Sequence, residues 1–278
     1  MLHKTFRIWM DFSDKMRKKN IATYSASTAF FFFLSLVPML MVLCTVLPYT
    51  PLTEKNLVDV VTDVTPEAVD SLATDLIREV YRTSAGALSL AIIATIWSAG
   101  KGVLALMRGL NAINDVEEKR NYLLVRLIAC FYTVVMLVVM ILFLFVMVFG
   151  NQLVNLMLHR VPQLRYLVSL YMEFRFFVVW VILTPLFAAI YAYVPDKRLR
   201  FKEQIPGASF TAVVWSVFSW GFSLYVSRSE AYSIYGSLSI IVIVMIWMYL
   251  GVYIIMIGAY LNQYFEPVNR VLMGTKHE

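Results

Sequence analysis

The sequence predicts an all-α membrane protein with six transmembrane helices, and three observations support this fold class. The composition is strongly apolar: 60% of residues are hydrophobic, 15% are charged and the mean hydropathy is +0.71, whereas soluble domains carry about a quarter charged residues. Uncharged residues also gather in six runs, 21–53, 83–100, 127–158, 176–195, 204–227 and 231–265. Each run approaches or exceeds the ~20 residues that one helical span needs, and continuous apolar runs fit helices better than alternating barrel strands.

The first segment, residues 1–20, has the pattern of an amphipathic helix. Apolar side chains recur there at helical spacing, and the basic residues lie off that stripe. The apolar positions are Leu2, Phe6, Trp9 and Met16. We expect this helix to lie on the inner leaflet of the membrane, and a solvated basic tail is the alternative.

The first predicted span, 26–48, leads into a long outer connection, 50–84. Pro38 lies inside the span and is expected to kink the helix. In the outer connection, Thr65 has the position of an N-cap and Pro66 that of the first helical residue. We therefore predict a helical outer loop after the first span.

Five further spans are predicted, and we expect them to pack through small residues. The spans are 85–104, 125–148, 176–194, 207–226 and 238–260. Small side chains let helix backbones approach closely, and the positions expected to do so are Ser98, Gly102, Gly251 and Gly258. No repeat, low-complexity tract or Gly/Ser linker divides the chain, so residues 1–278 are predicted to form a single membrane domain.

The distribution of Lys and Arg predicts the orientation of the chain. With the N-terminus inside, 17 of the 24 basic residues fall on the inner side and seven on the outer side. This bias favours a cytoplasmic location for both termini. The net charge of +6 is therefore mainly a topology signal, and we expect no nucleic-acid partner.

Five polar residues near the inner end of the second span form the main candidate binding site. They are Lys101, Arg108, Asn111, Arg120 and Arg126. The first three lie seven and three residues apart, which places them on roughly one face of a helix. Such a cluster can hold an anionic lipid headgroup or another phosphate. The alternative is that each basic side chain only reaches to the membrane interface and supports the topology.

The polar segment "AYSIYGSLS", residues 231–239, precedes the last span and is a second candidate site. Gly236 can break the helix, and nearby hydroxyl groups can satisfy the freed backbone. The residues concerned are Tyr232, Tyr235, Gly236 and Ser237. Irregular backbone at membrane depth is tolerated where it is buried in protein or lines a wet cavity. Two interpretations stay open: a plain interfacial cap, or an outer polar break that lines a cavity.

The sequence gives little support to enzyme chemistry. The three histidines lie far apart, at positions 3, 159 and 277, and no His/Cys/Asp cluster has metal-ligand spacing. No phosphate-binding loop is present, and neither cysteine has a histidine close in sequence. We expect no catalytic residue, no metal site and no cofactor.

Five short motifs, in this order, resemble the YihY/virulence factor BrkB family of bacterial membrane proteins. They are "FFFLSLVP" (31–38), "IWSAGKGVLALMRGLNAI" (96–113), "IPGASFTAVVW" (205–215), "YSIYGSLSIIVIVMIWMY" (232–249) and "IGAYLN" (257–262). The resemblance covers nearly the whole chain. Many family members carry an acidic residue where this chain has Tyr260, so a role for that acid does not carry over.

The resemblance implies a six-span protein of the bacterial cytoplasmic (inner or plasma) membrane with both termini in the cytoplasm. Members of the family were once labelled ribonuclease BN, and the scattered histidines argue against that activity here. We expect a transporter or lipid-handling protein that moves an amphiphile or lipid across or within the bilayer. The alternative is a non-transporting scaffold for envelope assembly. The expected partners are membrane lipids, such as an anionic phospholipid or glycolipid, and a second copy of the chain or another envelope protein.

Overall fold

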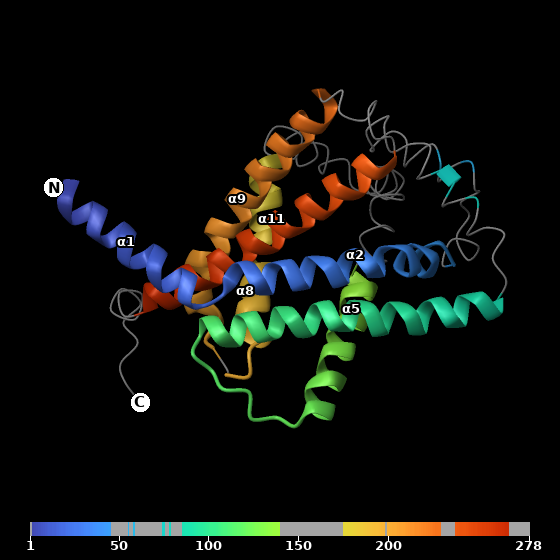
Figure 1. Cartoon of the computed structure of the whole chain (residues 1–278), viewed down its shortest axis with the longest axis horizontal. Coiled ribbons are helices and arrows are strands. Elements are labelled where there is room, and N and C mark those ends of the chain that lie inside the picture. Colours follow the sequence, from blue (N-terminus) through green and yellow to red (C-terminus); the bar gives the residue numbers. More distant parts are fainter. Residues whose placement is uncertain are drawn as a thin grey trace, which may run out of the picture.

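The computed structural model describes residues 2–45, 85–139, 175–197, 199–228 and 237–266, together with the isolated helical positions 55, 58, 74, 75 and 78. Within these residues all regular structure is α-helical, which confirms the predicted all-α class (Figure 1). The helices are α1 (Leu2–Lys18), α2 (Ile21–Thr45), α5 (Ala85–Ile113), Tyr122–Val139, α8 (Arg175–Tyr193), α9 (Phe201–Arg228) and α11 (Ser237–Tyr264).

Three helical segments are long and apolar enough to cross a membrane: Tyr122–Val139, Phe201–Val226 and Ile241–Tyr264. Ile21–Leu36 and Val179–Tyr193 are shorter apolar helical segments. Many of their large apolar side chains are exposed on the surface of the bundle, as lipid-facing side chains must be. The chain is therefore a membrane protein, and the count of six spans stays a prediction.

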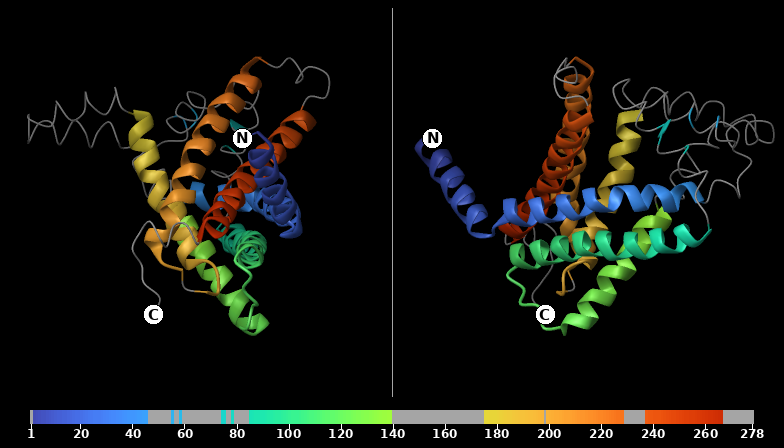
Figure 2. Two further views of the ribbon diagram at one scale, coloured as in Figure 1. Left: turned by 90° about the vertical axis from the view of Figure 1, so that its left-hand side faces the viewer. Right: turned by 45° about the vertical axis from the view of Figure 1, so that its right-hand side comes forward.

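The helices form two antiparallel pairs with α11 packed between them. α2 lies along α5, α8 lies along α9, and α11 contacts both α2 and α9 (Figures 1 and 2). The N-terminal ends of α2 and α9 meet the C-terminal ends of α5, α8 and α11 at one end of the molecule, and the helices diverge toward the other end (Figure 1). This alternation of direction is what successive membrane crossings require.

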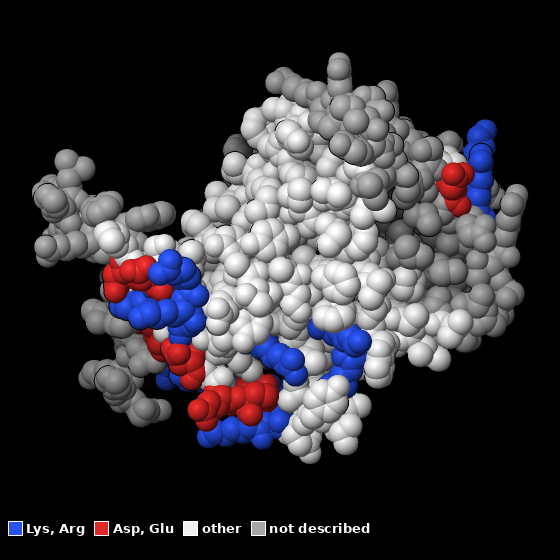
Figure 3. Space-filling model, in the orientation of Figure 1, with Lys and Arg blue, Asp and Glu red and all other residues white. Residues whose placement is uncertain are grey.

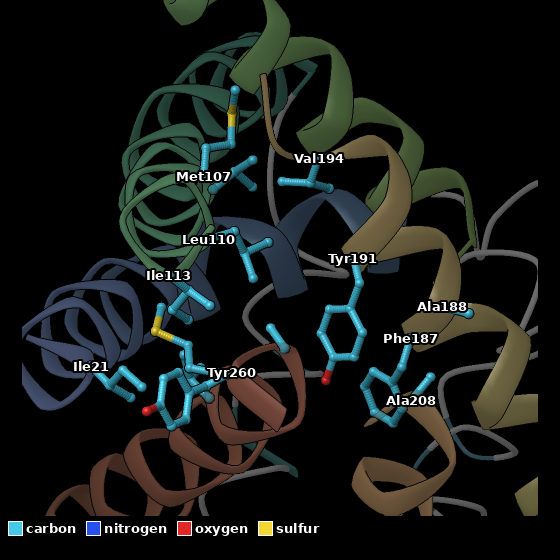
Figure 4. Packing of buried hydrophobic residues seen from close by; sticks show 14 of the residues in the cluster. Ile21, Met107, Leu110, Ile113, Phe187, Ala188, Tyr191, Val194, Ala208 and Tyr260 are labelled. Carbon is cyan, nitrogen blue, oxygen red and sulfur yellow. The ribbon is translucent and has the colours of Figure 1, made fainter. Parts of the chain in front are cut away.

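The core lies where the helices converge. Met107, Leu110 and Ile113 of α5 are fully buried, and they face Tyr191 of α8 and Tyr260 of α11 (Figure 4). Because each helix contributes its buried face near this one end, the convergent end is fixed by side-chain packing. Two residues of the predicted basic site, Arg108 and Asn111, lie near the C-terminal end of α5 and therefore at this convergent end.

Helix α1 projects from the bundle and is attached through its C-terminal half (Figure 2). The Phe12 ring lies 4.9 Å from the ring of Tyr260 and 5.2 Å from that of Tyr264. Asn20 takes a left-handed conformation, with φ of 53°, which lets the chain turn from α1 into α2. The predicted amphipathic segment thus forms a separate helix, and its location on the inner leaflet stays a prediction.

Three of the four small residues predicted to pack helices meet a neighbouring helix. A Cβ at Gly102 would lie 2.6 Å from the Phe32 ring, and one at Gly251 would lie 2.6 Å from the Trp215 ring. A Cβ at Gly258 would overlap the hydroxyl group of Thr211. The fourth residue, Ser98, is buried, and its hydroxyl donates a hydrogen bond to the Ala94 carbonyl of its own helix at 2.8 Å.

Two predicted elements lie outside the described residues. One is the outer loop 50–84, of which only the five isolated positions are described. The other is the polar break, because Tyr232, Tyr235 and Gly236 are not described and Ser237 is the first residue of α11. Both remain predictions.

Candidate functional site

Four of the five predicted site residues fall into two groups that differ in their surroundings. The first group, which we call the polar clamp, contains Asn111, Glu118, Arg120 and Asp196. Asn111 is only 4% exposed at the C-terminal end of α5. Its amide nitrogen donates a hydrogen bond to the Glu118 carboxylate at 2.9 Å, and its amide oxygen accepts one from the backbone N–H of Asp196 at 2.9 Å. Asn111 therefore ties the loop after α5 to the connection between α8 and α9.

Arg120 completes the polar clamp by joining two carboxylates. Its Nε lies 2.6 Å from Glu118 Oε1 and 3.0 Å from Asp196 Oδ1, and its Nη2 donates to Glu118 Oε2 at 2.8 Å. The side-chain hydrogen bond with Arg120 lowers the pKa of the Glu118 carboxyl, and the same bond raises the pKa of Arg120. One guanidinium between two carboxylates leaves the polar clamp with a net negative charge. It is therefore a poor site for a phosphate.

The second group, the Trp97 cation pair, consists of Lys101 and Arg126 around the indole ring of Trp97. The Arg126 guanidinium carbon lies 4.7 Å from the ring centre, and Arg126 Nη2 donates a hydrogen bond to the Trp97 carbonyl at 2.9 Å. Lys101 Nζ lies 5.9 Å from the Trp97 ring and 5.4 Å from the Phe31 ring of α2. These distances are within the range of cation–π attraction.

The Trp97 cation pair has no acidic partner among the described residues. Every described ion pair involves other basic residues. Two cations near one ring repel each other, and charges on membrane helices are costly unless they are paired. The Trp97 side chain is 60% exposed, so the group opens to the outside of the bundle. An anion that reached both cations would relieve their repulsion.

Arg108 belongs to neither group. It is exposed on α5, seven residues after Lys101, and forms no ion pair among the described residues. The structure thus brings Lys101 and Arg126 together, places Asn111 and Arg120 in the polar clamp and leaves Arg108 apart. This makes Arg108 a suitable reference cation for experiments.

Sequence reasoning missed the residues that distinguish the two groups. Trp97 and Lys101 are four residues apart on one helix, and this spacing was an available signal for their contact. Glu118 and Asp196 lie in charged connections, where most acids are solvated, so the sequence indicates no role for them. Their pairing with Arg120 depends on two connections meeting in space, and nothing in the sequence spacing indicates it.

A separate set of hydrogen bonds around Asn262 joins α9 to α11. The amide oxygen of Asn262 accepts a bond from the Gly207 N–H at 2.7 Å, and its nitrogen donates to the Gln204 carbonyl at 3.0 Å and side-chain oxygen at 3.1 Å. Asn262 is buried, and both ends of its amide are used. We assign this set to helix packing. Within the described residues, no group of three or more His, Cys, Asp or Glu could hold a metal ion.

The family model described as virulence factor BrkB matches residues 12–274. The chain belongs to this family. Among its relatives, the ribonuclease-like protein YfkH of Bacillus subtilis is 35% identical over 240 residues, which is 86% of this chain and 87% of YfkH. A UPF0761 membrane protein of Pseudoalteromonas translucida is 38% identical over 84 residues, 30% of this chain and 28% of that protein. No solved structure matches.

The resemblance to the BrkB family is therefore confirmed, and the match covers both groups of residues. It includes the polar clamp, the Trp97 cation pair and the half of α1 that contacts α11. The name UPF0761 membrane protein agrees with the apolar helices of this BrkB-family chain. The words "ribonuclease-like" describe YfkH and identify no catalytic group in this chain.

Proposed function

We propose that this BrkB-family membrane protein binds an anionic lipid or a similar amphiphile at the Trp97 cation pair and moves it across or within the bilayer. One observation carries the proposal: Lys101 and Arg126 approach one exposed indole ring, and neither forms an ion pair among the described residues. A phosphate supplies the missing negative charge and accepts hydrogen bonds from both side chains. An anionic phospholipid or glycolipid headgroup provides such a phosphate within the membrane.

The positions of the two cations favour ligand binding over a purely topological role. Lys101 Nζ lies over two aromatic rings, 5.4 Å from the centre of Phe31 and 5.9 Å from that of Trp97. Arg126 turns toward the carbonyl of Trp97 on a neighbouring helix. Side chains that only reach for interfacial water extend away from the apolar region. Here both cations converge on one ring.

We place the protein in the bacterial cytoplasmic membrane with both termini in the cytoplasm. The excess of Lys and Arg in the inner connections supports this orientation. The charged side chains of the described residues gather mainly along one border of the molecule, and a wide uncharged surface lies beside them (Figure 3). In this orientation the basic helix α1 extends at the cytoplasmic surface, where anionic lipids attract it.

The proposed activity is not enzymatic and requires no cofactor or nucleic acid. The two carboxylates of the polar clamp, Glu118 and Asp196, are each committed to an ion pair with Arg120. A scaffold for envelope assembly is the competing function. In a scaffold, Lys101 and Arg126 would contribute to folding or to contacts with another protein, and their removal would leave the bound lipids unchanged.

Native mass spectrometry of the purified protein tests the proposal. We expect the wild type to retain phosphatidylglycerol or cardiolipin, and Lys101→Ala with Arg126→Ala to reduce that retention about ten-fold or more. Arg108→Ala, which removes an exposed cation from the same helix, should retain lipid as the wild type does. Equal retention by all three proteins would favour the scaffold. Proteoliposomes with a fluorescent anionic lipid then test whether the same double variant slows movement between leaflets.

A further inference from the structure

We infer that the apolar pocket beside the Trp97 cation pair holds an acyl chain of an anionic phospholipid whose phosphate lies at Lys101 and Arg126. This inference rests on the proposed function, because it assigns the rest of the ligand to the same site. It goes further by giving the ligand an orientation and by distinguishing a lipid from a free phosphate.

The pocket has a volume of ≈ 60 Å³ and lies where four helices meet. The helices are α2, α5, α11 and Tyr122–Val139, and residues that line it include Phe32, Met39, Ala99, Met136 and Met248. One water-sized probe needs about 10–15 Å³, so the pocket has room for a short run of methylene groups. Methionine side chains adapt readily to a flexible apolar ligand.

The pocket is chemically suited to hydrocarbon. Its two hydroxyl groups donate to carbonyl groups of their own helices: Ser35 to Phe32 at 2.7 Å, and Thr133 to Ala129 at 2.8 Å. Because these donors are already used, a water molecule in the pocket would find few partners. Apolar walls around empty space lack dispersion contacts on one side. A hydrocarbon chain would supply those contacts.

The pocket and the Trp97 cation pair are adjacent on the same helices. On α5, Gly100 stands between Ala99, which lines the pocket, and Lys101. A Cβ at Gly100 would lie 3.7 Å from both Arg126 Nη1 and Thr133 Oγ1, so a cation and a pocket residue meet at one point of α5. On α2, Phe31 contacts Lys101 and the next residue, Phe32, lines the pocket.

A pair of cations next to an apolar pocket matches a phospholipid, in which a phosphate is linked to acyl chains. Both parts of the site are open to the surrounding membrane, because Trp97 is 60% exposed and Met136 is 42% exposed. A lipid can therefore enter from the bilayer. A free phosphate would use the cations alone, and a neutral lipid would use the pocket alone, so the inference requires both parts to act on one molecule.

Photocrosslinking in nanodiscs tests this arrangement. The probe is phosphatidylglycerol with a diazirine in its acyl chain, compared with the same probe built on phosphatidylcholine. We expect the phosphatidylglycerol probe to label peptides that contain Met39, Met136 or Met248 at least about five-fold more strongly. Unlabelled phosphatidylglycerol should compete, whereas soluble glycerol phosphate should not. Equal labelling by both probes, or labelling only elsewhere, would overturn the inference.

Substitutions that fill the pocket give a second test. Ala99→Phe should reduce labelling at these peptides about five-fold, and Met136→Trp, at the exposed edge, should do so if Ala99→Phe does not fold. Val217→Phe, on the exposed surface of α9, is the matched control and should label as the wild type does. If lipid retention depends on Lys101 and Arg126 but labelling lies outside the pocket, the proposed function stands and this inference fails. If phosphatidylglycerol is retained no better than phosphatidylcholine, both fail.

Discussion

The polar clamp and the Trp97 cation pair each contain an arginine, yet the surroundings of the two arginines are opposite. Arg120 lies between the carboxylates of Glu118 and Asp196. Arg126 lies over an indole ring that it shares with Lys101, a second cation. The comparison teaches that a cluster of basic residues in a membrane protein does not by itself identify a binding site. The presence or absence of an acidic partner separates a structural arginine from one that can accept an anion.

The two groups should therefore respond differently to substitution. Removal of one partner from the polar clamp leaves a carboxylate or guanidinium without its counter-charge, so the main loss is in folding stability. Removal of a cation from the Trp97 pair relieves repulsion between like charges, so the main loss is in ligand binding.

The largest effect is expected for Arg120→Ala. The side chain of Arg120 is 19% exposed and that of Asp196 is 21% exposed, which lies between surface pairs worth 0–1 kcal/mol and buried pairs whose disruption costs about 3–5 kcal/mol. We expect a loss of about 2 kcal/mol in the free energy of unfolding, measured by thermal or denaturant unfolding in detergent. Lipid retention per folded molecule should not change.

Arg200→Ala is the matched control for Arg120→Ala. Arg200 also pairs with a carboxylate, that of Glu203, but at 3.8 Å and with 58% of its side chain exposed. Its removal should change stability by less than about 1 kcal/mol. If Arg120→Ala lowers lipid retention and leaves stability unchanged, the polar clamp is part of the binding site and the contrast is wrong.

The next largest effect is expected for Trp97→Leu, this time on binding. The indole ring attracts both cations, and each such contact contributes about 0.5–1 kcal/mol at exposed sites. Without the ring, Lys101 and Arg126 lose their common support, and retention of phosphatidylglycerol in native mass spectrometry should fall about five-fold. The control Trp220→Leu removes another exposed tryptophan, from α9, and should retain lipid normally. A loss in both variants would indicate a general effect of surface tryptophans on lipid contact.

The sequence predicts contacts between residues that are close along one helix, but it does not predict contacts between residues that are far apart in the chain. The all-α class follows from long uncharged runs, and the approach of Trp97 to Lys101 follows from helical spacing within α5. The contact of Arg126 with Trp97 joins residues 29 positions apart on two helices. It depends on how those helices cross, which a single sequence does not reveal.

The role of Arg120 was harder still to predict. Its second carboxylate, Asp196, belongs to the connection between α8 and α9, which meets the loop after α5 only in the folded chain. From the sequence, Arg120 looked equivalent to Arg126, since both follow the second span within a basic segment. Local patterns identified which residues carry charge, but tertiary packing decided which charges are neutralised.

The smallest effect is expected for the pH dependence of the polar clamp. The side-chain hydrogen bond from Arg120 lowers the pKa of Glu118 from its ordinary value of 4.5. A group with a lowered pKa in the folded state stabilises the protein above its ordinary pKa, and this contribution is lost as pH falls through the folded value. The wild type should therefore be more stable than Glu118→Gln at pH 7, and the difference between their melting temperatures should shrink below about pH 4.5 and vanish at still lower pH.

The exposed neighbour of Glu118 offers the control for this prediction. Glu117→Gln should match the wild type across the same pH range, since Glu117 forms no ion pair among the described residues. A constant difference between the wild type and Glu118→Gln at all pH values would mean that the glutamine perturbs packing and that the charge of Glu118 contributes nothing to the polar clamp.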